Sequence, residues 1–186
     1  MAHPMRLTRD GSALVVVDVQ ERLFAAMDAE HREEVAKNLK VLATAARRLS
    51  LPILVTEQYP KGLGHTLPEI KEALGPVEPL EKVAFSCCDA EGFGARLRAT
   101  NRKQVILAGI EAHVCVLLTG LDLLAEGYGV HVAADAVTSR TQGNWRMGVD
   151  QLRQAGAVIT TTESVLFQLL EKADTDDFRT LARLIK

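Results

Sequence analysis

Aromatic residues are scarce in this chain of 186 residues, because five Phe, two Tyr and one Trp make up only 4% of it. The core must therefore be built from Val, Leu, Ile and Ala. Neither sign of charge dominates, since 22 basic and 24 acidic residues leave a formal charge of −2. This balance gives no electrostatic reason to expect a nucleic-acid partner or an anionic membrane surface.

Cysteines and long apolar runs are also few. The three cysteines are an odd number without the regular spacing of a disulfide framework, which favours a reducing compartment such as the cytoplasm. No stretch approaches the ~20 consecutive apolar residues of a membrane-spanning helix. The first ten residues contain no signal-peptide stretch either. We expect a cytoplasmic chain with no membrane partner and, at roughly 150 residues per domain, one domain over residues 1–186.

Short β-branched runs alternate along the chain with amphipathic patterns. The runs predict strands at residues 13–19, 53–56, 104–108, 130–134 and 157–160. Apolar residues at three- and four-residue steps predict helices at residues 30–49, 114–126 and 145–155. Weaker signals indicate helices near residues 69–73, after a capping box at Thr160 and Glu163, and from Asp174 to Lys186. This alternation predicts a three-layer, doubly wound α/β fold whose ligand crevice lies at the carboxyl ends of parallel strands.

Three residues with reactive or charged side chains fall near the carboxyl ends of strands. Asp18 interrupts the first apolar run, and a buried carboxylate there needs a cationic or hydrogen-bonding partner. Lys82 precedes a short apolar stretch, where an acid would draw it inward. Cys115 lies six residues after Gly109, at the first turn of the next predicted helix. Helix-start N–H groups and a nearby lysine lower the pKa of a thiol in such a position.

Each of these residues also has a purely structural interpretation. Asp18 would cap a neighbouring loop, Lys82 would be a surface side chain, and Cys115 would be a small apolar core residue. Together, however, the three side chains form a plausible nucleophile system. The aspartate takes the thiol proton, the lysine stabilises thiolate and carboxylate, and helix-start N–H groups receive the developing oxyanion.

Three segments carry a resemblance to a known family: residues 15–20 (VVVDVQ), residues 82–86 around Lys82, and residues 109–116 (GIEAHVCV). Their order and spacing resemble those of the isochorismatase-like cysteine hydrolases, over essentially the whole chain. The chain is most similar to the isochorismatase-domain-containing branch. This resemblance implies a Rossmann-like sheet of about six parallel strands between helices, and a homo-oligomer such as a dimer or tetramer.

The resemblance also implies roles for particular residues. The catalytic triad would be Asp18, Lys82 and Cys115, and the backbone N–H groups of Glu111 and Cys115 would form an oxyanion hole. A cis peptide bond would join Ile110 to Glu111. The implied reaction is hydrolysis of a small amide-type C–N bond through a thioester. It implies no cofactor and no metal, because the Asp-x-His metal motif of nicotinamidases is replaced here by TEQYP at residues 56–60.

Five further residues are candidates for binding a small-molecule substrate. The aromatic side chains of Phe24, Tyr59 and Phe85 would form a wall beside the thiol, or else pack in the core. Gln58 would orient a polar substrate, or else hydrogen-bond loop backbone. His113 would contact the substrate, or else be an oriented structural histidine.

Two other functions stay open on the sequence alone. In one, the chain is an isochorismatase-type vinyl-ether hydrolase in which Asp18 is the general acid and Cys115 is incidental. In the other, it is a non-catalytic redox-sensing protein whose Cys115 is a low-pKa thiol that oxidises. The presence of Cys115 favours amide-type hydrolysis. The adjacent Cys87 and Cys88 are expected to be inert.

Overall fold

The computed structural model describes residues 3 and 5–185. Met1, Ala2, Pro4 and Lys186, which belong to the N-terminal segment and to the last predicted helix, lie outside the described residues. Within the described part, six parallel strands form one sheet in the order β3-β2-β1-β4-β5-β6. This order reverses direction between β1 and β4, which confirms the predicted doubly wound α/β class.

Five of the six strands coincide with the predicted runs. The strands are β1 (Ser12–Val17), β2 (Ile53–Gln58), β3 (Leu80–Lys82), β4 (Gln104–Ile110), β5 (Gly129–Thr138) and β6 (Val158–Thr160). The pattern did not reveal β3, because three residues are too few to display a period and only pairing with β2 defines them. β5 runs on to Thr138, since its pairing with β4 shifts register between Leu107 and Gly109.

The long predicted helices are also present. The helices are α1 (Glu21–Ala25), α2 (Arg32–Arg48), α3 (Pro60–Leu63), α4 (Pro68–Leu74), α5 (Phe93–Ala99), α6 (Cys115–Ala125), α7 (Gln142–Gln154), α8 (Thr162–Leu170) and α9 (Asp176–Leu181), with a 3-10 turn at Ala182–Ile185. α1, α3 and α5 are too short to have shown periodicity. The predicted cap was one residue early: Thr160 ends β6, and the side chain of Thr161 accepts the N–H of Ser164 at the start of α8.

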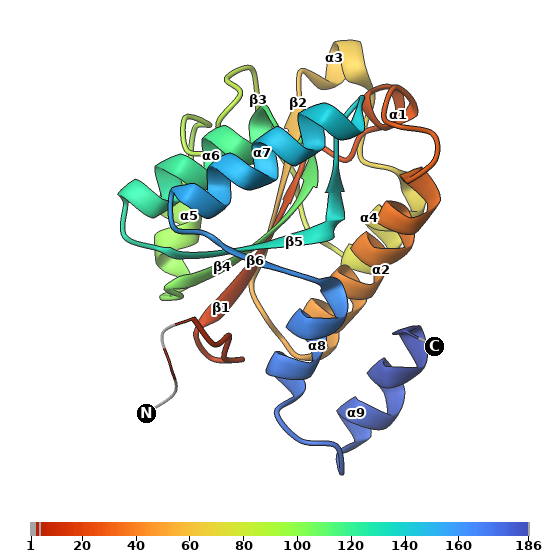
Figure 1. The fold of residues 1–186 in the computed structure, drawn as a ribbon, viewed down its shortest axis with the longest axis vertical. Coiled ribbons are helices and arrows are strands. Elements are labelled where there is room, and N and C mark those ends of the chain that lie inside the picture. Colours follow the sequence, from red (N-terminus) through yellow and green to blue (C-terminus); the bar gives the residue numbers. More distant parts are fainter. Residues whose placement is uncertain (1–2, 4, 186) are drawn as a thin grey trace.

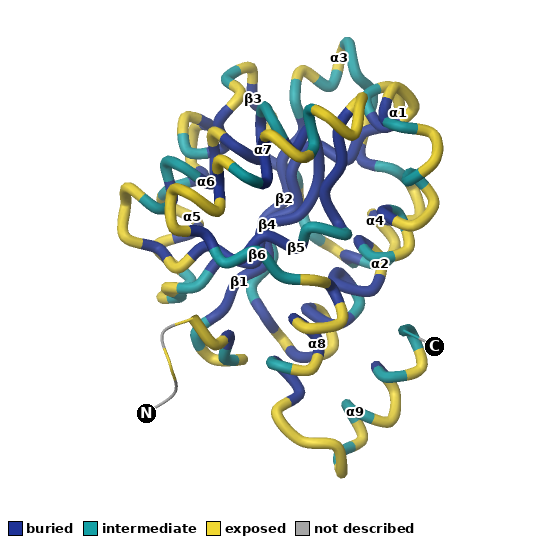
Figure 2. Tube along the Cα trace, viewed as in Figure 1, coloured by how far each residue is buried: buried dark blue, intermediate teal, exposed yellow. Residues whose placement is uncertain are grey.

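Helices cover both faces of the sheet. α2, α4, α8 and α9 lie on one face and α5, α6 and α7 on the other (Figure 1). Alternate residues of β1 divide between the two cores, with Val16 in one and Val15 and Val17 in the other. Figure 2 shows the buried strands enclosed by helices whose outer sides are exposed. Burial on both faces explains why the strands read as continuous apolar runs.

The carboxyl ends of the strands meet at the edge of the sheet where α1 and α3 lie (Figure 1). β1 and β4 approach closely there. Gly109 has a φ of +118°, and a Cβ atom at this position would lie 2.2 Å from the carbonyl oxygen of Val17. Only glycine therefore permits this contact between the two strands. None of the helices in residues 3 and 5–185 has the length and hydropathy needed to cross a bilayer.

One buried histidine lies outside this edge. His131, in β5, is 1% exposed, and its Nδ1 has no hydrogen-bond partner among the described residues. Burial lowers the pKa of His131 from 6.5 to about 4. The unfolded chain therefore binds this proton at a higher pH than the folded chain. The contribution of neutral His131 to the free energy of unfolding is fully present above about pH 6.5 and is lost as the pH falls toward 4.

We expect wild-type protein to lose up to about 3 kcal/mol more unfolding free energy than a His131→Leu variant when the pH drops from 7 to 4. Urea denaturation at pH 7, 5.5 and 4 would measure this difference. Equal pH dependence of the two proteins would show that His131 does not carry the effect.

Candidate functional site

Asp18 follows β1 directly and is held from two sides. Its φ of 52° turns the chain out of the strand, and the residue is 0% exposed. The Nζ atom of Lys82 donates to its Oδ2 at 2.7 Å, and the Oγ1 atom of Thr56 donates to its Oδ1 at 2.7 Å. The buried carboxylate thus has the cationic partner that its position in the sequence required.

Lys82 reaches Asp18 from the end of β3, with β2 lying between the two strands. Its Nζ atom also donates to Gln58 Oε1 at 2.7 Å and to the carbonyl oxygens of Ala84 and Phe85 at 3.2 and 3.0 Å. The side chain is 0% exposed, so the surface interpretation of Lys82 is wrong. Four acceptors surround three N–H bonds, and the ammonium group therefore fixes the chain that follows β3 as well as Asp18.

Cys115 is the first residue of α6 and is 5% exposed. Burial raises the pKa of its thiol to about 12; the Asp18 carboxylate adds to the rise, and Lys82 offsets only part of it. The expectation of a lowered pKa was wrong, because burial and a neighbouring anion outweigh the helix start. The resting thiol keeps its proton, and a thiolate forms only when a base nearby takes that proton.

The turn between β4 and α6 carries two unpaired N–H groups. The peptide bond between Ile110 and Glu111 is cis. Among the described residues, the N–H groups of Glu111 and Cys115 have no acceptor, whereas those of Val114 and Val116 both donate to the carbonyl oxygen of Glu111. Free N–H groups in the turn that bears a nucleophile are suited to receive developing negative charge.

Gln58 and His113 both have partners within the protein. The amide oxygen of Gln58 accepts from Lys82, and its Nε2 atom donates to the carbonyl oxygen of Val83 at 2.8 Å. The Nδ1 atom of His113 lies 3.0 Å from Ser139 Oγ. Gln58 therefore makes the loop-backbone contact, and His113 the structural contact, that were the alternatives to substrate binding.

The three candidate aromatic residues do not share one environment. Tyr59 and Phe85 are 54% and 57% exposed, whereas Phe24 is 8% exposed. Phe24 packs in the core on the α2 face of the sheet, while Cys115 packs in the core on the opposite face. Only Tyr59 and Phe85 are exposed enough to meet a ligand from solvent.

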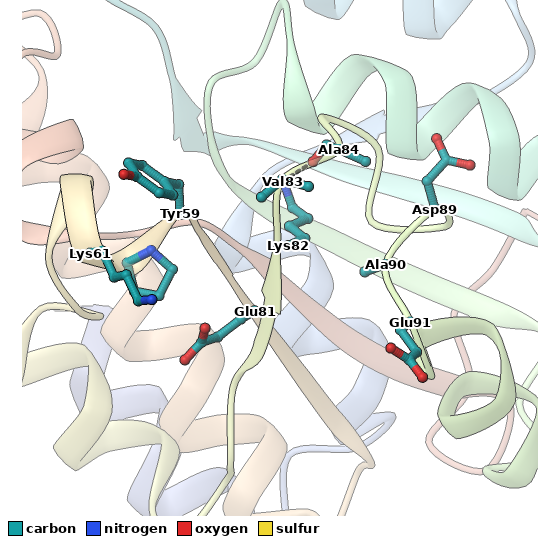
Figure 3. Close-up of a pocket in the computed structure, with 10 residues that line it drawn as sticks. Tyr59, Lys61, Glu81, Lys82, Val83, Ala84, Asp89, Ala90 and Glu91 are labelled. Carbon is teal, nitrogen blue, oxygen red and sulfur yellow. Dashed lines mark hydrogen bonds between the residues drawn. The ribbon is translucent and has the colours of Figure 1, made fainter.

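A surface pocket of about 490 Å³ lies against the free edge of β3. Figure 3 shows Tyr59 and Lys61 on one side of it and Asp89 and Glu91 on the other, with Lys82 between them. Neither the carboxylate nor the thiol of the predicted triad lines this pocket. It therefore lies beside the triad and does not open onto the thiol.

The region that carries the nicotinamidase metal motif is organised differently here. The Nδ1 atom of His65 lies 2.9 Å from Glu57 Oε2, and the other oxygen of that carboxylate accepts from Thr66. Within residues 3 and 5–185, no group of three or more His, Cys, Asp or Glu side chains is placed to hold a metal ion.

Two residues at the site were not recognised from the sequence. Thr56 was read only as part of a strand, although a hydroxyl in register with the end of β1 lies next to Asp18. Cys87 was expected to be inert; it is buried, and its Sγ atom lies 3.4 Å from Thr56 Oγ1. Burial raises the pKa of Cys87 to about 11 and that of Cys88 to about 12.

Comparison with known proteins identifies the family. The model of the isochorismatase domain matches residues 12–164. The chain belongs to the isochorismatase family. This membership supports a hydrolase with the expected fold.

Three proteins similar to this isochorismatase-family hydrolase carry different descriptions. The secreted isochorismatase effector Isc1 of Phytophthora sojae is 42% identical over 97% of this chain and 87% of its own length. The solved structure of the MAR1 ribonuclease from Caenorhabditis elegans is 41% identical, covers 97% of this chain and 92% of that one, and has a TM-score of 0.90. The YcaC gene product of Escherichia coli, an octameric hydrolase of unknown specificity, is 27% identical, covers 100% of this chain and 91% of that one, and has a TM-score of 0.92.

Replacing Lys82 by Met would leave the Asp18 carboxylate buried without a cation. We expect Lys82→Met to lower the free energy of unfolding by about 3–5 kcal/mol, measured by urea denaturation at pH 7. Arg153→Met is the matched control, because it removes an exposed ion pair with Asp150 and is expected to cost less than about 1 kcal/mol. Similar losses in the two variants would contradict this account of the buried pair.

Proposed function

We propose that the chain is a metal-independent cysteine hydrolase that cleaves a small amide-type C–N bond. The environment of Asp18 carries this proposal. The carboxylate is fully buried, is held by Lys82 at 2.7 Å, and adds to the rise that burial causes in the pKa of the Cys115 thiol. A fixed base that interacts with a thiol is the arrangement that activates a cysteine nucleophile.

In the first half of the proposed reaction, the proton of Cys115 passes to Asp18. The thiolate then attacks the amide carbonyl carbon and forms the C–S bond. The oxyanion receives hydrogen bonds from the N–H groups of Glu111 and Cys115. As the intermediate collapses, the C–N bond breaks and the leaving amine takes the proton from Asp18, which leaves a thioester on the sulfur.

In the second half, a water molecule takes the place of the amine. Asp18 accepts one proton from this water while the water oxygen attacks the thioester carbon. The C–S bond breaks, and the sulfur of Cys115 recovers the proton from Asp18. One amide and one water have then given a carboxylic acid and an amine. Lys82 keeps its hydrogen bond to Asp18, and in this proposal the chain itself supplies nucleophile, base and oxyanion donors without a cofactor.

The other functions have less support. An isochorismatase-type vinyl-ether hydrolase would give no role to Cys115 or to the N–H groups of Glu111 and Cys115, which have no acceptor within the described part of the chain. A redox sensor needs an accessible thiol of low pKa, whereas Cys115 is 5% exposed and its pKa is raised. Ribonuclease activity, named for the C. elegans relative, gains no electrostatic support from a formal charge of −2.

The substrate would be a small molecule that approaches the thiol past the exposed rings of Tyr59 and Phe85. Gln58 would support this entrance through its hydrogen bond to the carbonyl oxygen of Val83 and His113 through its contact with Ser139, while Phe24 packs in the core on the other face of the sheet. We propose that residues 1–186 act as one hydrolase domain. A free cysteine nucleophile needs reducing surroundings, which favours the cytoplasm, although the P. sojae relative is named as secreted.

Replacement of the nucleophile tests this function directly. We expect Cys115→Ala to reduce turnover about 1000-fold or more, because no thioester can form. Intact-mass spectrometry after incubation with a panel of small amides, isochorismate and RNA would detect an acyl adduct on wild-type protein and none on the variant. Cys88→Ala is the control and should keep both adduct and turnover. Full turnover by Cys115→Ala, combined with loss of activity in Asp18→Asn, would favour vinyl-ether hydrolysis instead.

We further propose that the chain forms a homo-oligomer through the free edge of β3. The E. coli relative is octameric. Val83, directly after β3, is 80% exposed and lines the 490 Å³ pocket beside Ala84. Exposed apolar side chains around a pocket are typical of a contact surface, and a second copy on this edge would shield Val83 from water.

Val83→Glu would place a charge in this contact. We expect wild-type protein to elute as an oligomer in size-exclusion chromatography with light scattering, and Val83→Glu to shift toward the 20.3 kDa monomer. Phe167→Glu is the control, because Phe167 is also exposed but lies on α8, on the opposite face of the sheet from α6. A wild-type monomer, or equal masses for all three proteins, would contradict the proposed contact.

A further inference from the structure

A series of buried side chains connects Asp18 to the helix that bears the thiol. The Oγ1 atom of Thr56 donates to Asp18 Oδ1 at 2.7 Å and lies 3.4 Å from the Sγ atom of Cys87. The backbone N–H of Cys87 donates to Thr119 Oγ1 at 2.9 Å. Thr56, Cys87 and Thr119 are each 0% exposed. Thr119 lies about one turn after Cys115 on α6, so the series returns to the helix of the nucleophile.

The protons of this series have one consistent arrangement. A threonine hydroxyl has a single proton, and that of Thr56 goes to Asp18, since an ionised carboxylate can only accept. The contact between Cys87 and Thr56 must therefore run from the S–H group to the hydroxyl oxygen. Cys87 retains the proton that this requires, because burial raises its pKa to about 11. The thiol of Cys87 thus holds the hydroxyl of Thr56 in the orientation that serves Asp18.

We infer that Thr56, oriented by Cys87, is a positioning residue that sets how a proton is shared between Cys115 and Asp18. This inference rests on the proposed cysteine-hydrolase function. The Thr56 hydrogen bond is strongest to the ionised carboxylate, so it favours the resting state with a neutral thiol. For the same reason it makes protonated Asp18 a better proton donor to the leaving amine.

Thr56→Val removes the hydroxyl and keeps a side chain of similar shape. Asp18 then becomes a stronger proton acceptor, and more of the protein carries a thiolate next to a protonated Asp18. We expect the rate constant for alkylation of Cys115 by iodoacetamide to rise about tenfold near pH 7.5. In the pH profile of this rate constant, the pH of half-maximal rate should be about one unit higher in Thr56→Val than in wild type. The profiles of the two proteins should then converge at low pH. Peptide mass spectrometry would follow Cys115 separately from Cys87 and Cys88.

Two further variants separate proton control from structural support. Thr56→Ser keeps the donor and should restore the wild-type profile. Thr66→Val is the matched control, because Thr66 is 4% exposed and its Oγ1 atom donates to Glu57 Oε1 at 2.7 Å, away from Asp18. Like Thr56→Val, it should lower the melting temperature. Unlike Thr56→Val, it should leave the pH profile of Cys115 alkylation unchanged.

The outcomes distinguish this inference from the proposed function. A Thr56→Val profile equal to that of wild type would overturn the inference, as would the same shift in Thr66→Val. Should Thr56→Val fail to fold, Thr56→Ala also removes the hydroxyl without crowding Cys87 and carries the same expectation. The proposed function fails separately, when Cys115→Ala retains turnover or when no amide acylates wild-type Cys115.

Discussion

The buried ion pair between Lys82 and Asp18 is the interaction on which the site depends. It joins the edge strand β3 to the central strand β1 across β2, at a point where both side chains are 0% exposed. Neither charge is stable there alone, so each strand end fixes the other. β2 completes the arrangement, since its Gln58 accepts from Lys82 and its Thr56 donates to Asp18. The position of Asp18 in turn determines the behaviour of the Cys115 thiol.

Burial controls the thiol of Cys115 in an unusual way. Many reactive cysteines carry a low pKa in the resting state, but here burial and the Asp18 carboxylate raise the pKa of Cys115 to about 12. In the proposed mechanism, a thiol of this kind forms a thiolate only by proton transfer to Asp18. In the proposed mechanism, reactivity therefore appears only when a substrate is aligned with Asp18 and with the N–H groups that precede α6.

Much of the fold could be predicted from local patterns. The apolar runs of β1 and β4 and the long amphipathic helices α2, α6 and α7 contain enough residues to display their periods. The three-residue β3 does not, and its pairing with β2 exists only in the folded chain. The same limit applies at the site: Asp18 and Cys115 stand out beside apolar runs, whereas Thr56 gains importance only from the register that sets β2 beside β1.

Residue type and spacing by themselves determined the α/β class, the position of Asp18 at the end of the first strand and that of Cys115 at the first turn of a helix. Tertiary structure alone decided the depth at which these groups lie. Local position at a helix start predicts a lowered thiol pKa, but a pKa depends on every charge and on all the water displaced around the group. Those quantities are set by segments far apart in the chain, and they reversed the sign of the shift at Cys115.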